Sequence, residues 1–168
     1  VNPLIATLGT MIAFRGLGNQ ITDAQVVLLP DSLRMFGNFA LGPVFFDSIL
    51  FLVLLALVHT LHQNTAFGKV VMAIGNDELT ARRVGLPVTR TVFLSFAIAG
   101  VLASIGGFLA SAQVGAVTSF LGKGMEFTAV AVVVVGGISL FGGRGSIFWG
   151  VILGSLTFEV IRSGLNHI

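Results

Sequence analysis

Residues 91–114, TVFLSFAIAGVLASIGGFLASAQV, form a run of twenty-four residues without a single charge. A helix needs about 20 mostly apolar residues to cross the roughly 30 Å hydrocarbon core of a bilayer. The rest of the chain has the same character, because 55% of its 168 residues are hydrophobic and 10% are charged. Soluble domains carry about 25% charged residues. The sequence therefore predicts an integral membrane protein.

Further apolar stretches on both sides of this segment predict additional membrane helices. We expect five crossings in all, at residues 3–19, 44–61, 91–114, 127–143 and 145–158. The expected fold class is all-α, a polytopic transmembrane helix bundle with short, Gly-interrupted helices. We treat residues 1–168 as a single transmembrane domain. The first residue is not Met and the last residues carry no charged tail, so we also expect an internal piece of a longer membrane protein.

A short charged segment, GNDELTARRVGLP (residues 75–87), interrupts the apolar chain with four of its sixteen charges. Its loop, residues 63–90, holds four of the nine basic residues, so the positive-inside rule predicts that this loop is cytoplasmic. Alternation of the crossings then places residues 20–43 and 115–125 outside. A short polar helix is expected over residues 76–85. Such a helix contacts neither lipid nor a core of its own, so it needs water or a partner protein.

Several kinds of chemistry are missing from the sequence. There is no Cys, which excludes disulfides and thiolate chemistry. Residues 137–145, GISLFGGRG, resemble a phosphate-binding loop but lack its Lys and the following hydroxyl residue. His59 and His62 are spaced like metal ligands without a third ligand nearby, and we interpret them as interfacial histidines. We therefore expect no enzyme activity, no cofactor, no metal site and no nucleic-acid partner.

Glycines are concentrated in residues 120–147 and leave two readings open. Non-helical backbone at membrane depth is tolerated where it lines a cavity, which favours a transport path. Small residues also let helices pack closely, which favours a structural role. Gly150 and Gly154 form a GxxxG pair of the second kind.

Six motifs, in order along the chain, carry a resemblance to one family. They are IATLGTM (5–11) with RGL (15–17), FGK (67–69) with AIGN (73–76), ARRVGLPV (81–88), GMEF (124–127), VGGISLFGGRGS (135–146) and GLN (164–166). Together they resemble the ribose-type sugar permeases of ABC transporters over essentially the whole chain. Met125 and Thr128 depart from residues that are common in that family, which bears on the identity of the sugar.

The resemblance implies the membrane-spanning permease of a bacterial importer for monosaccharides or similar small polyhydroxy compounds. The implied location is the inner membrane, and the implied partners are ABC ATPase subunits, a second permease subunit, as a homo- or heterodimer, and a periplasmic substrate-binding protein. The helix at 76–85 would couple to the ATPase, with Leu79, Ala81 and Val84 docked in a groove and Arg82 and Arg83 at the rim. The full set of expected coupling residues is Asn76, Asp77, Glu78, Leu79, Ala81, Arg82, Arg83, Val84 and Gly85. Asn76 or Asp77 would cap this helix, and Gly85 with Pro87 would end it.

Candidates for the substrate path are polar or small residues in the apolar segments. Hydroxyl and carboxylate groups can hydrogen-bond sugar hydroxyls, and glycines expose backbone. The expected path residues are Thr7, Thr10, Glu126, Gly136, Gly137 and Ser139. Two alternatives stay open: a branched-chain amino-acid ABC permease, and a passive channel or structural membrane subunit that uses no ATP.

Overall fold

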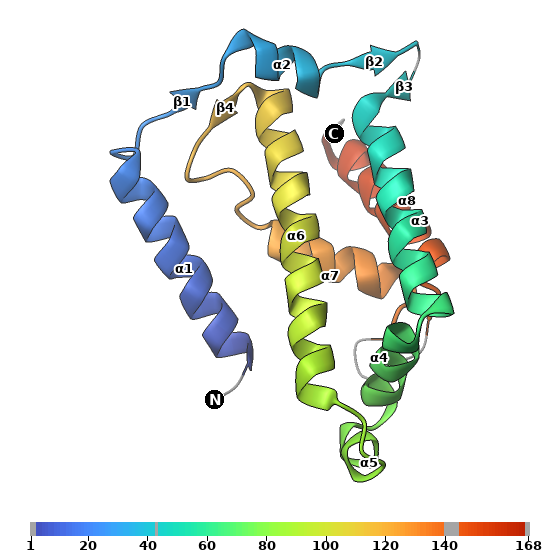
Figure 1. Cartoon of the computed structure of the whole chain (residues 1–168). Coiled ribbons are helices and arrows are strands. Elements are labelled where there is room, and N and C mark those ends of the chain that lie inside the picture. Colours follow the sequence, from blue (N-terminus) through green and yellow to red (C-terminus); the bar gives the residue numbers. More distant parts are fainter. Residues whose placement is uncertain (1–2, 43, 140–144, 167–168) are drawn as a thin grey trace. The chain divides into compact units, whose positions relative to one another are not determined.

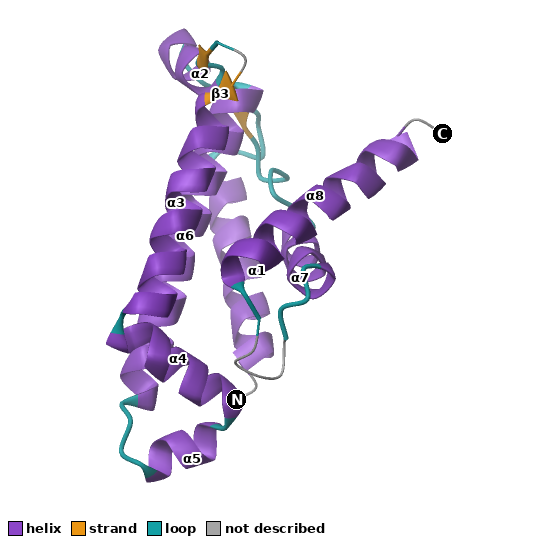
Figure 2. Ribbon diagram, turned by 90° about the vertical axis from the view of Figure 1, so that its right-hand side faces the viewer, coloured by secondary structure: helices purple, strands orange, loops and turns teal. Residues whose placement is uncertain are grey.

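The computed structural model describes residues 3–42, 44–139 and 145–166, which are predominantly helical (Figure 1). The helices are α1 (Pro3–Ile21), α2 (Asp31–Gly37), α3 (Phe46–Asn64), α4 (Ala66–Asn76), α5 (Glu78–Arg83), α6 (Val88–Val114), α7 (Met125–Val135) and α8 (Ile147–Asn166). The strands have two residues each: β1 (Val27–Leu28), β2 (Ala40–Leu41), β3 (Val44–Phe45) and β4 (Ala116–Val117). Figure 2 shows how little of the chain is strand. The predicted all-α class is confirmed.

Three of the described helices, α3, α6 and α8, are long and apolar enough to cross a membrane. They correspond to the crossings expected at 44–61, 91–114 and 145–158. Helix α8 continues well beyond the expected end at residue 158, because Glu159 and Arg162 lie on the same helix and form an ion pair at 3.9 Å. The charged residues Glu159 and Arg162 therefore do not end this helix.

The two other expected crossings do not meet the same criteria. Helix α1 has 19 residues, as α3 does, but it carries Arg15, Asn19 and Gln20, which lower its hydropathy. Helix α7 has only 11 residues, about 16 Å at 1.5 Å per residue, which is roughly half of a hydrocarbon core. It ends at Val135, and residues 140–143 of the crossing expected at 127–143 lie outside the described part of the chain.

The chain divides into two compact units, of which the first comprises Val1–Asp47 and Ser104–Lys123. In this unit β1 pairs antiparallel with β4, with Val27 opposite Val117, and β2 pairs antiparallel with β3. Helix α2 packs closely on the end of α6, because a Cβ atom on Gly37 would lie 2.5 Å from the Ala112 carbonyl carbon. The expected outer loop at 20–43 thus contains a helix and parts of two small sheets.

Three side-chain contacts hold the first unit together near α2. The ring of Phe36 lies 5.3 Å from the ring of Phe46 and 6.4 Å from that of Phe108, measured between centroids. The Gln113 side-chain amide donates a hydrogen bond to the Asp47 carboxylate. This pair joins the start of α3 to the end of α6.

The second unit comprises Ser48–Ala103 and Gly124–Ile168, and its closest helix pair is α7 with α8. A Cβ atom on Gly136 would overlap the carbonyl oxygen of Gly150, and one on Gly154 would overlap that of Val132. The GxxxG pair therefore brings two helix backbones together, as the sequence predicts. For Gly136, Gly150 and Gly154 the packing interpretation of the glycine-rich region is the one that the contacts support.

Candidate functional site

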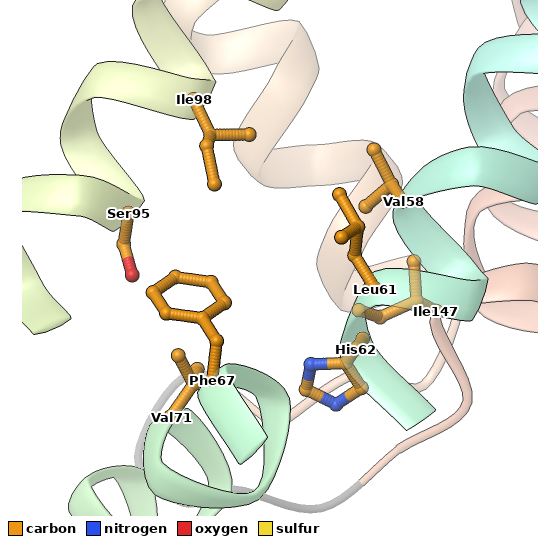
Figure 3. A pocket seen from close by; sticks show the side chains of 8 residues that line it. All are labelled: Val58, Leu61, His62, Phe67, Val71, Ser95, Ile98 and Ile147. Carbon is orange, nitrogen blue, oxygen red and sulfur yellow. The ribbon is translucent and has the colours of Figure 1, made fainter. Parts of the chain in front are cut away.

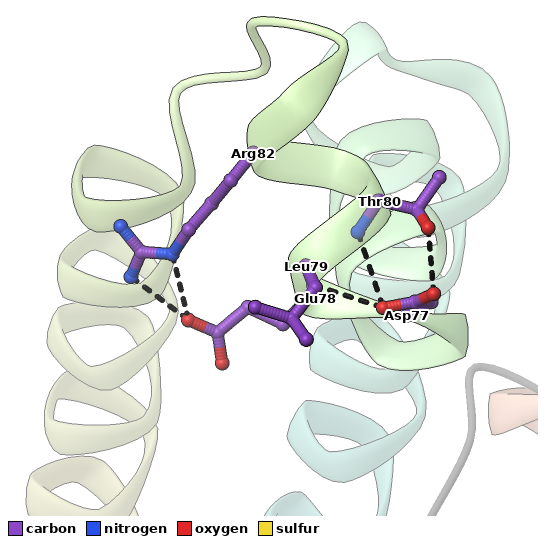
Figure 4. Close-up of polar contacts among 5 residues, drawn as sticks. All are labelled: Asp77, Glu78, Leu79, Thr80 and Arg82. Carbon is purple, nitrogen blue, oxygen red and sulfur yellow. Dashed lines mark hydrogen bonds and ion pairs between the residues drawn. The ribbon is translucent and has the colours of Figure 1, made fainter.

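The charged segment forms a separate short helix, α5, at the end of the longer α4 (Figure 4). Asp77 is its N-cap: the Asp77 carboxylate accepts hydrogen bonds from the Leu79 N–H at 2.9 Å and from the Thr80 N–H at 3.1 Å. The Thr80 hydroxyl donates to the other carboxylate oxygen at 2.6 Å. Of the two expected caps, Asp77 is the one that the structure uses, since Asn76 is the last residue of α4.

These hydrogen bonds also act on the titration of Asp77. The hydrogen bonds from the Thr80 hydroxyl and N–H, and then from the Leu79 N–H, favour the carboxylate and hold the pKa of Asp77 below its ordinary value. At neutral pH the cap is therefore fully charged. Its negative charge lies at the positive end of the α5 dipole.

The end of α5 is fixed by a glycine in the left-handed region. Gly85 has φ +79°, its N–H donates to the Arg82 carbonyl, and the Leu86 N–H donates to the Ala81 carbonyl, both at 3.1 Å. This is the Schellman pattern, in which a glycine follows the last helical turn. Along the helix, the Arg82 guanidinium donates to the Glu78 carboxylate at 2.8 and 3.0 Å (Figure 4). The expected helix boundary at Gly85 is confirmed.

The outward face of α5 differs from the expected one at a single residue. Leu79 and Val84 are 68% and 67% exposed, and Arg83 is exposed as well. Ala81 is only 3% exposed, so its side chain faces into this chain. The docking role expected for Ala81 is therefore wrong in this structure: its methyl group is used inside the unit, and Leu79 and Val84 remain as apolar groups open to a partner.

A tight turn around Thr65 and Gly68, called the elbow below, connects α4 to the apolar helix α3. The Thr65 hydroxyl donates to the Leu61 carbonyl and accepts a hydrogen bond from the Gly68 N–H at 3.3 Å. Gly68 is buried, and a Cβ atom there would overlap the His62 carbonyl group. The angle between α3 and α4 is thus set by backbone contact.

An apolar cavity of about 210 Å³ lies beside this elbow (Figure 3). Helices α3, α4, α6 and α8 supply its lining, which is Val58, Leu61, His62, Phe67, Val71, Ser95, Ile98 and Ile147. The imidazole of His62 belongs to this lining, and the ring of His59 lies 5.4 Å from that of Phe148. Among the described residues, no group of three or more His, Cys, Asp or Glu could hold a metal ion.

The expected path residues lie on different elements. Thr7 and Thr10 are exposed on α1, and the Thr10 hydroxyl bonds to the Ala6 and Thr7 carbonyls of its own helix. Glu126 is half-buried in the first turn of α7, after Gly124 with φ +87°. Gly136, Gly137 and Ser139 follow the other end of α7, about 15 Å away along the helix axis. Gly136, Gly137 and Ser139 therefore lie close together, and Glu126 lies apart from them.

Gly137 has a local structural role of its own. It has φ +74°, its N–H donates to the Val134 carbonyl at 3.0 Å, and the Ile138 N–H donates to the Val133 carbonyl at 3.1 Å. Helix α7 therefore ends in the same Schellman pattern as α5. Ser139 is exposed just after this turn.

Sequence reasoning missed a cavity of about 340 Å³ in the first unit. Its lining comes from α1, the residue after it, the end of β4 and the two residues that follow β4. It consists of Met11, Phe14, Arg15, Gly18, Thr22, Val117, Thr118 and Ser119. From the sequence, Arg15 is only part of the RGL motif at residues 15–17. A usable signal was present, because Met11, Arg15, Gly18 and Thr22 recur at helical spacing.

Comparison with known proteins places the chain in a family of transport proteins. Residues 1–168 match the family described as the branched-chain amino acid transport system / permease component. The probable ABC transporter permease protein YphD of Escherichia coli K12 is 39% identical over 98% of this chain and 50% of its own length. The galactose/methyl galactoside import permease protein MglC of Salmonella typhimurium is 38% identical over 100% of this chain and 52% of its own. The ribose import permease protein RbsC of Bacillus subtilis is 35% identical over 98% and 52%.

The chain spans about half the length of these relatives. No solved structure matches it. The family and the three apolar helices make the chain part of a multi-pass inner-membrane protein. Because the match extends over all 168 residues, the chain belongs to the family of the branched-chain amino acid transport system permease component, and these relatives are named ABC-type or import permeases.

Proposed function

We propose that the chain is the membrane-spanning part of a permease that imports monosaccharides or similar small polyhydroxy compounds with energy from ATP. One observation carries the proposal: a capped and glycine-terminated helix, α5, presents Leu79 and Val84 away from its own unit. Apolar side chains exposed on a polar segment between membrane helices are typical of a protein contact. The names of the galactose and ribose import permeases among the relatives support the substrate class.

In the proposed mechanism, α5 docks on an ABC ATPase subunit through Leu79 and Val84, with Arg83 at the edge of the contact. Helix α5 is joined to α4, which meets α3 at the Gly68 elbow. A movement of the ATPase would thus turn α4 and, through backbone contact, α3. Coupling of this kind requires that α5 bind the ATPase with different free energies in its two states.

The remaining partners follow from the same proposal. A second permease subunit would complete the path, a periplasmic binding protein would deliver the substrate, and the ATPase would carry out the only covalent chemistry. The chain itself would act as a transporter and not as an enzyme, and it would need no cofactor.

Two other functions fit less well. The family description names branched-chain amino acids, but the galactose and ribose import permeases among the relatives support sugars. A passive channel or structural subunit has no need of a docking helix, so the exposed face of α5 counts against it.

The test uses single cysteines in the full-length protein, with other cysteines removed, reconstituted with its ATPase. Leu79→Cys should crosslink to single-Cys variants of the ATPase, and the yield should change when ATP is added. Ala81→Cys is the matched control, because Ala81 itself is only 3% exposed and a cysteine at this position should crosslink poorly. Labelling of Leu79→Cys by an impermeant reagent from outside, with no crosslink, would refute the proposal and favour the passive channel or structural subunit.

A further inference from the structure

The cavity in the first unit is lined by one charged side chain, by hydroxyl groups and by apolar side chains. Its volume of about 340 Å³ lies in the range of roughly 300–1,000 Å³ that is usual for small-molecule sites. Arg15 supplies the charge, while Thr22, Thr118 and Ser119 supply hydroxyl groups. Phe14, Met11 and Val117 supply the apolar surface.

Most of the α1 positions that line the cavity are more buried than the rest of the helix, although Phe14 is 74% exposed. Met11, Arg15, Gly18 and Thr22 are half-buried, whereas most other side chains of α1 are exposed. These positions recur every three or four residues and therefore share one side of the helix. Thr7, one turn before Met11, lies on the same side, which links an expected path residue to the cavity face.

Several polar groups of the lining have no partner within the described residues. The Arg15 guanidinium makes no ion pair there, and the hydroxyls of Thr118 and Ser119 make no hydrogen bond there. The Thr22 hydroxyl donates to the Gly18 carbonyl at 2.9 Å, so its oxygen can still accept. A half-buried cation without a partner is costly, which marks Arg15 as a candidate for ligand binding.

The segment that carries the two free hydroxyls is held in place by backbone pairing. β4 is hydrogen-bonded to β1, and the Leu29 N–H donates to the Gly115 carbonyl at 3.0 Å. Gly115 has φ +73°, and the Arg34 side chain covers it, 2.5 Å from where a Cβ atom would stand. Thr118 and Ser119 therefore follow a fixed strand, so the cavity is largely preformed.

We propose that this cavity is a binding site for a small polyhydroxy compound on the outer side of the permease. The planar guanidinium of Arg15 can donate to two neighbouring hydroxyls of the ligand. Thr118 and Ser119 can donate or accept, and the apolar C–H face of the ligand can lie against Phe14. The proposal rests on the proposed function and deepens it, because it assigns a substrate contact to particular residues.

The mixture of groups favours a polyhydroxy ligand over a phosphate or carboxylate. Anion sites gather several donors, commonly with more than one cation or a helix N-terminus. Here Arg15 is the one cation of the lining, and the Thr22 hydroxyl, which already donates to Gly18, can only accept from a ligand that has donors. The apolar side chains of Met11 and Val117 offer an anion no hydrogen-bond donor.

The test measures protection of a cysteine in the lining. Ser119→Cys is placed in the full-length protein with its other cysteines removed, and an impermeant thiol reagent is added from outside. Galactose, ribose and any sugar found to be taken up should each be tried, and at least one should slow the labelling in a saturable way. Ser32→Cys, on the exposed start of α2, is the control whose labelling should not change.

A second variant connects the protection to Arg15. Adding Arg15→Gln should leave labelling without sugar unchanged and should raise the sugar concentration needed for protection about tenfold or more, the loss expected for a charged hydrogen bond. The proposal is overturned if no sugar protects, if inorganic phosphate protects equally well, or if Ser119→Cys cannot be labelled because another segment covers it.

ATP-dependent uptake, measured in parallel, separates this proposal from the proposed function. Uptake without protection would remove the site but keep the importer. Protection without ATP-dependent uptake would keep the site but contradict the importer.

Discussion

The backbone of Gly68 lies directly against the carbonyl group of His62, and a Cβ atom at position 68 would stand 2.6 Å from the His62 Cα atom. The contact joins α4 to α3 without any side chain between them. In the proposed mechanism it is the point at which a movement of α5 reaches a membrane helix.

Gly68→Ala should therefore weaken the elbow. The added methyl group meets backbone, which cannot move aside cheaply, and such overpacking costs about 1–3 kcal/mol. We expect a lower melting temperature in detergent and reduced substrate-stimulated ATP hydrolysis. Gly100→Ala is the control, because its Cβ atom would meet nothing within 4 Å. Equal stability of the two variants would contradict the close contact.

Asp77→Ala should unravel the start of α5, since loss of a side-chain N-cap costs about 1 kcal/mol. Hydrogen exchange of the peptide that contains residues 78–83 should speed up, and stimulation of ATP hydrolysis should fall. Asp77→Asn is the matched control, because Asn is also a good cap and should keep most of both properties. Normal stimulation in Asp77→Ala would show that α5 need not be ordered.

The Asp77 cap should also depend on pH in one direction. Its pKa is lower when folded than the ordinary 3.8, so the stabilisation is fully present above the ordinary value and is lost as the pH falls through the folded pKa. Protection of the α5 amides, corrected for intrinsic exchange, should be constant from pH 7 to about 4 and fall only in stronger acid. In Asp77→Asn this loss should disappear.

Gly154→Ala should separate α7 from α8. Its Cβ atom would overlap the Val132 carbonyl, and helices that approach through small residues tolerate no added methyl group at the contact. We expect a loss of about 1–3 kcal/mol, seen as a lower melting temperature. Gly164→Ala on the same helix meets nothing within 4 Å and should be neutral. If the two variants have the same melting temperature, the contact between α7 and α8 is not as close as described.

Glu126→Gln tests the most polar of the expected path residues. If its carboxylate contacts the sugar, uptake should fall while the amount of protein in the membrane stays the same. The amide keeps the size of the side chain, so a structural defect is not expected. Unchanged uptake would remove Glu126 from the path.

The sequence predicts the long helices well and the short ones less well. α3 and α6 are found almost at their observed bounds, because uninterrupted apolar runs determine membrane helices directly. α8 is underestimated, since Glu159 and Arg162 pair within the helix instead of ending it. α7 is overestimated, since Gly136 and Gly137 end it by a local turn that hydropathy does not reveal.

In the candidate site, too, features that depend on neighbouring residues are predicted better than features that depend on distant segments. The cap at Asp77 and the end at Gly85 follow from rules on neighbouring residues, and the structure has both. The cavity beside Arg15 depends on segments distant in the chain, because residues 11–22 and 117–119 line it together. A pattern within one segment can mark the face of a helix, as for Met11, Arg15 and Gly18, but it does not show which distant segment lies against that face.

The pairing of β1 with β4 has a consequence for the order in which the protein is made. Val27 and its partner Val117 are about 90 residues apart in the chain, and contacts of such long separation form late. During synthesis, α3, α4, α5 and α6 all leave the ribosome before Val117 does. The first unit is therefore incomplete, with α1 already made, until α6, the second of the three long apolar helices of the described residues, has been synthesised.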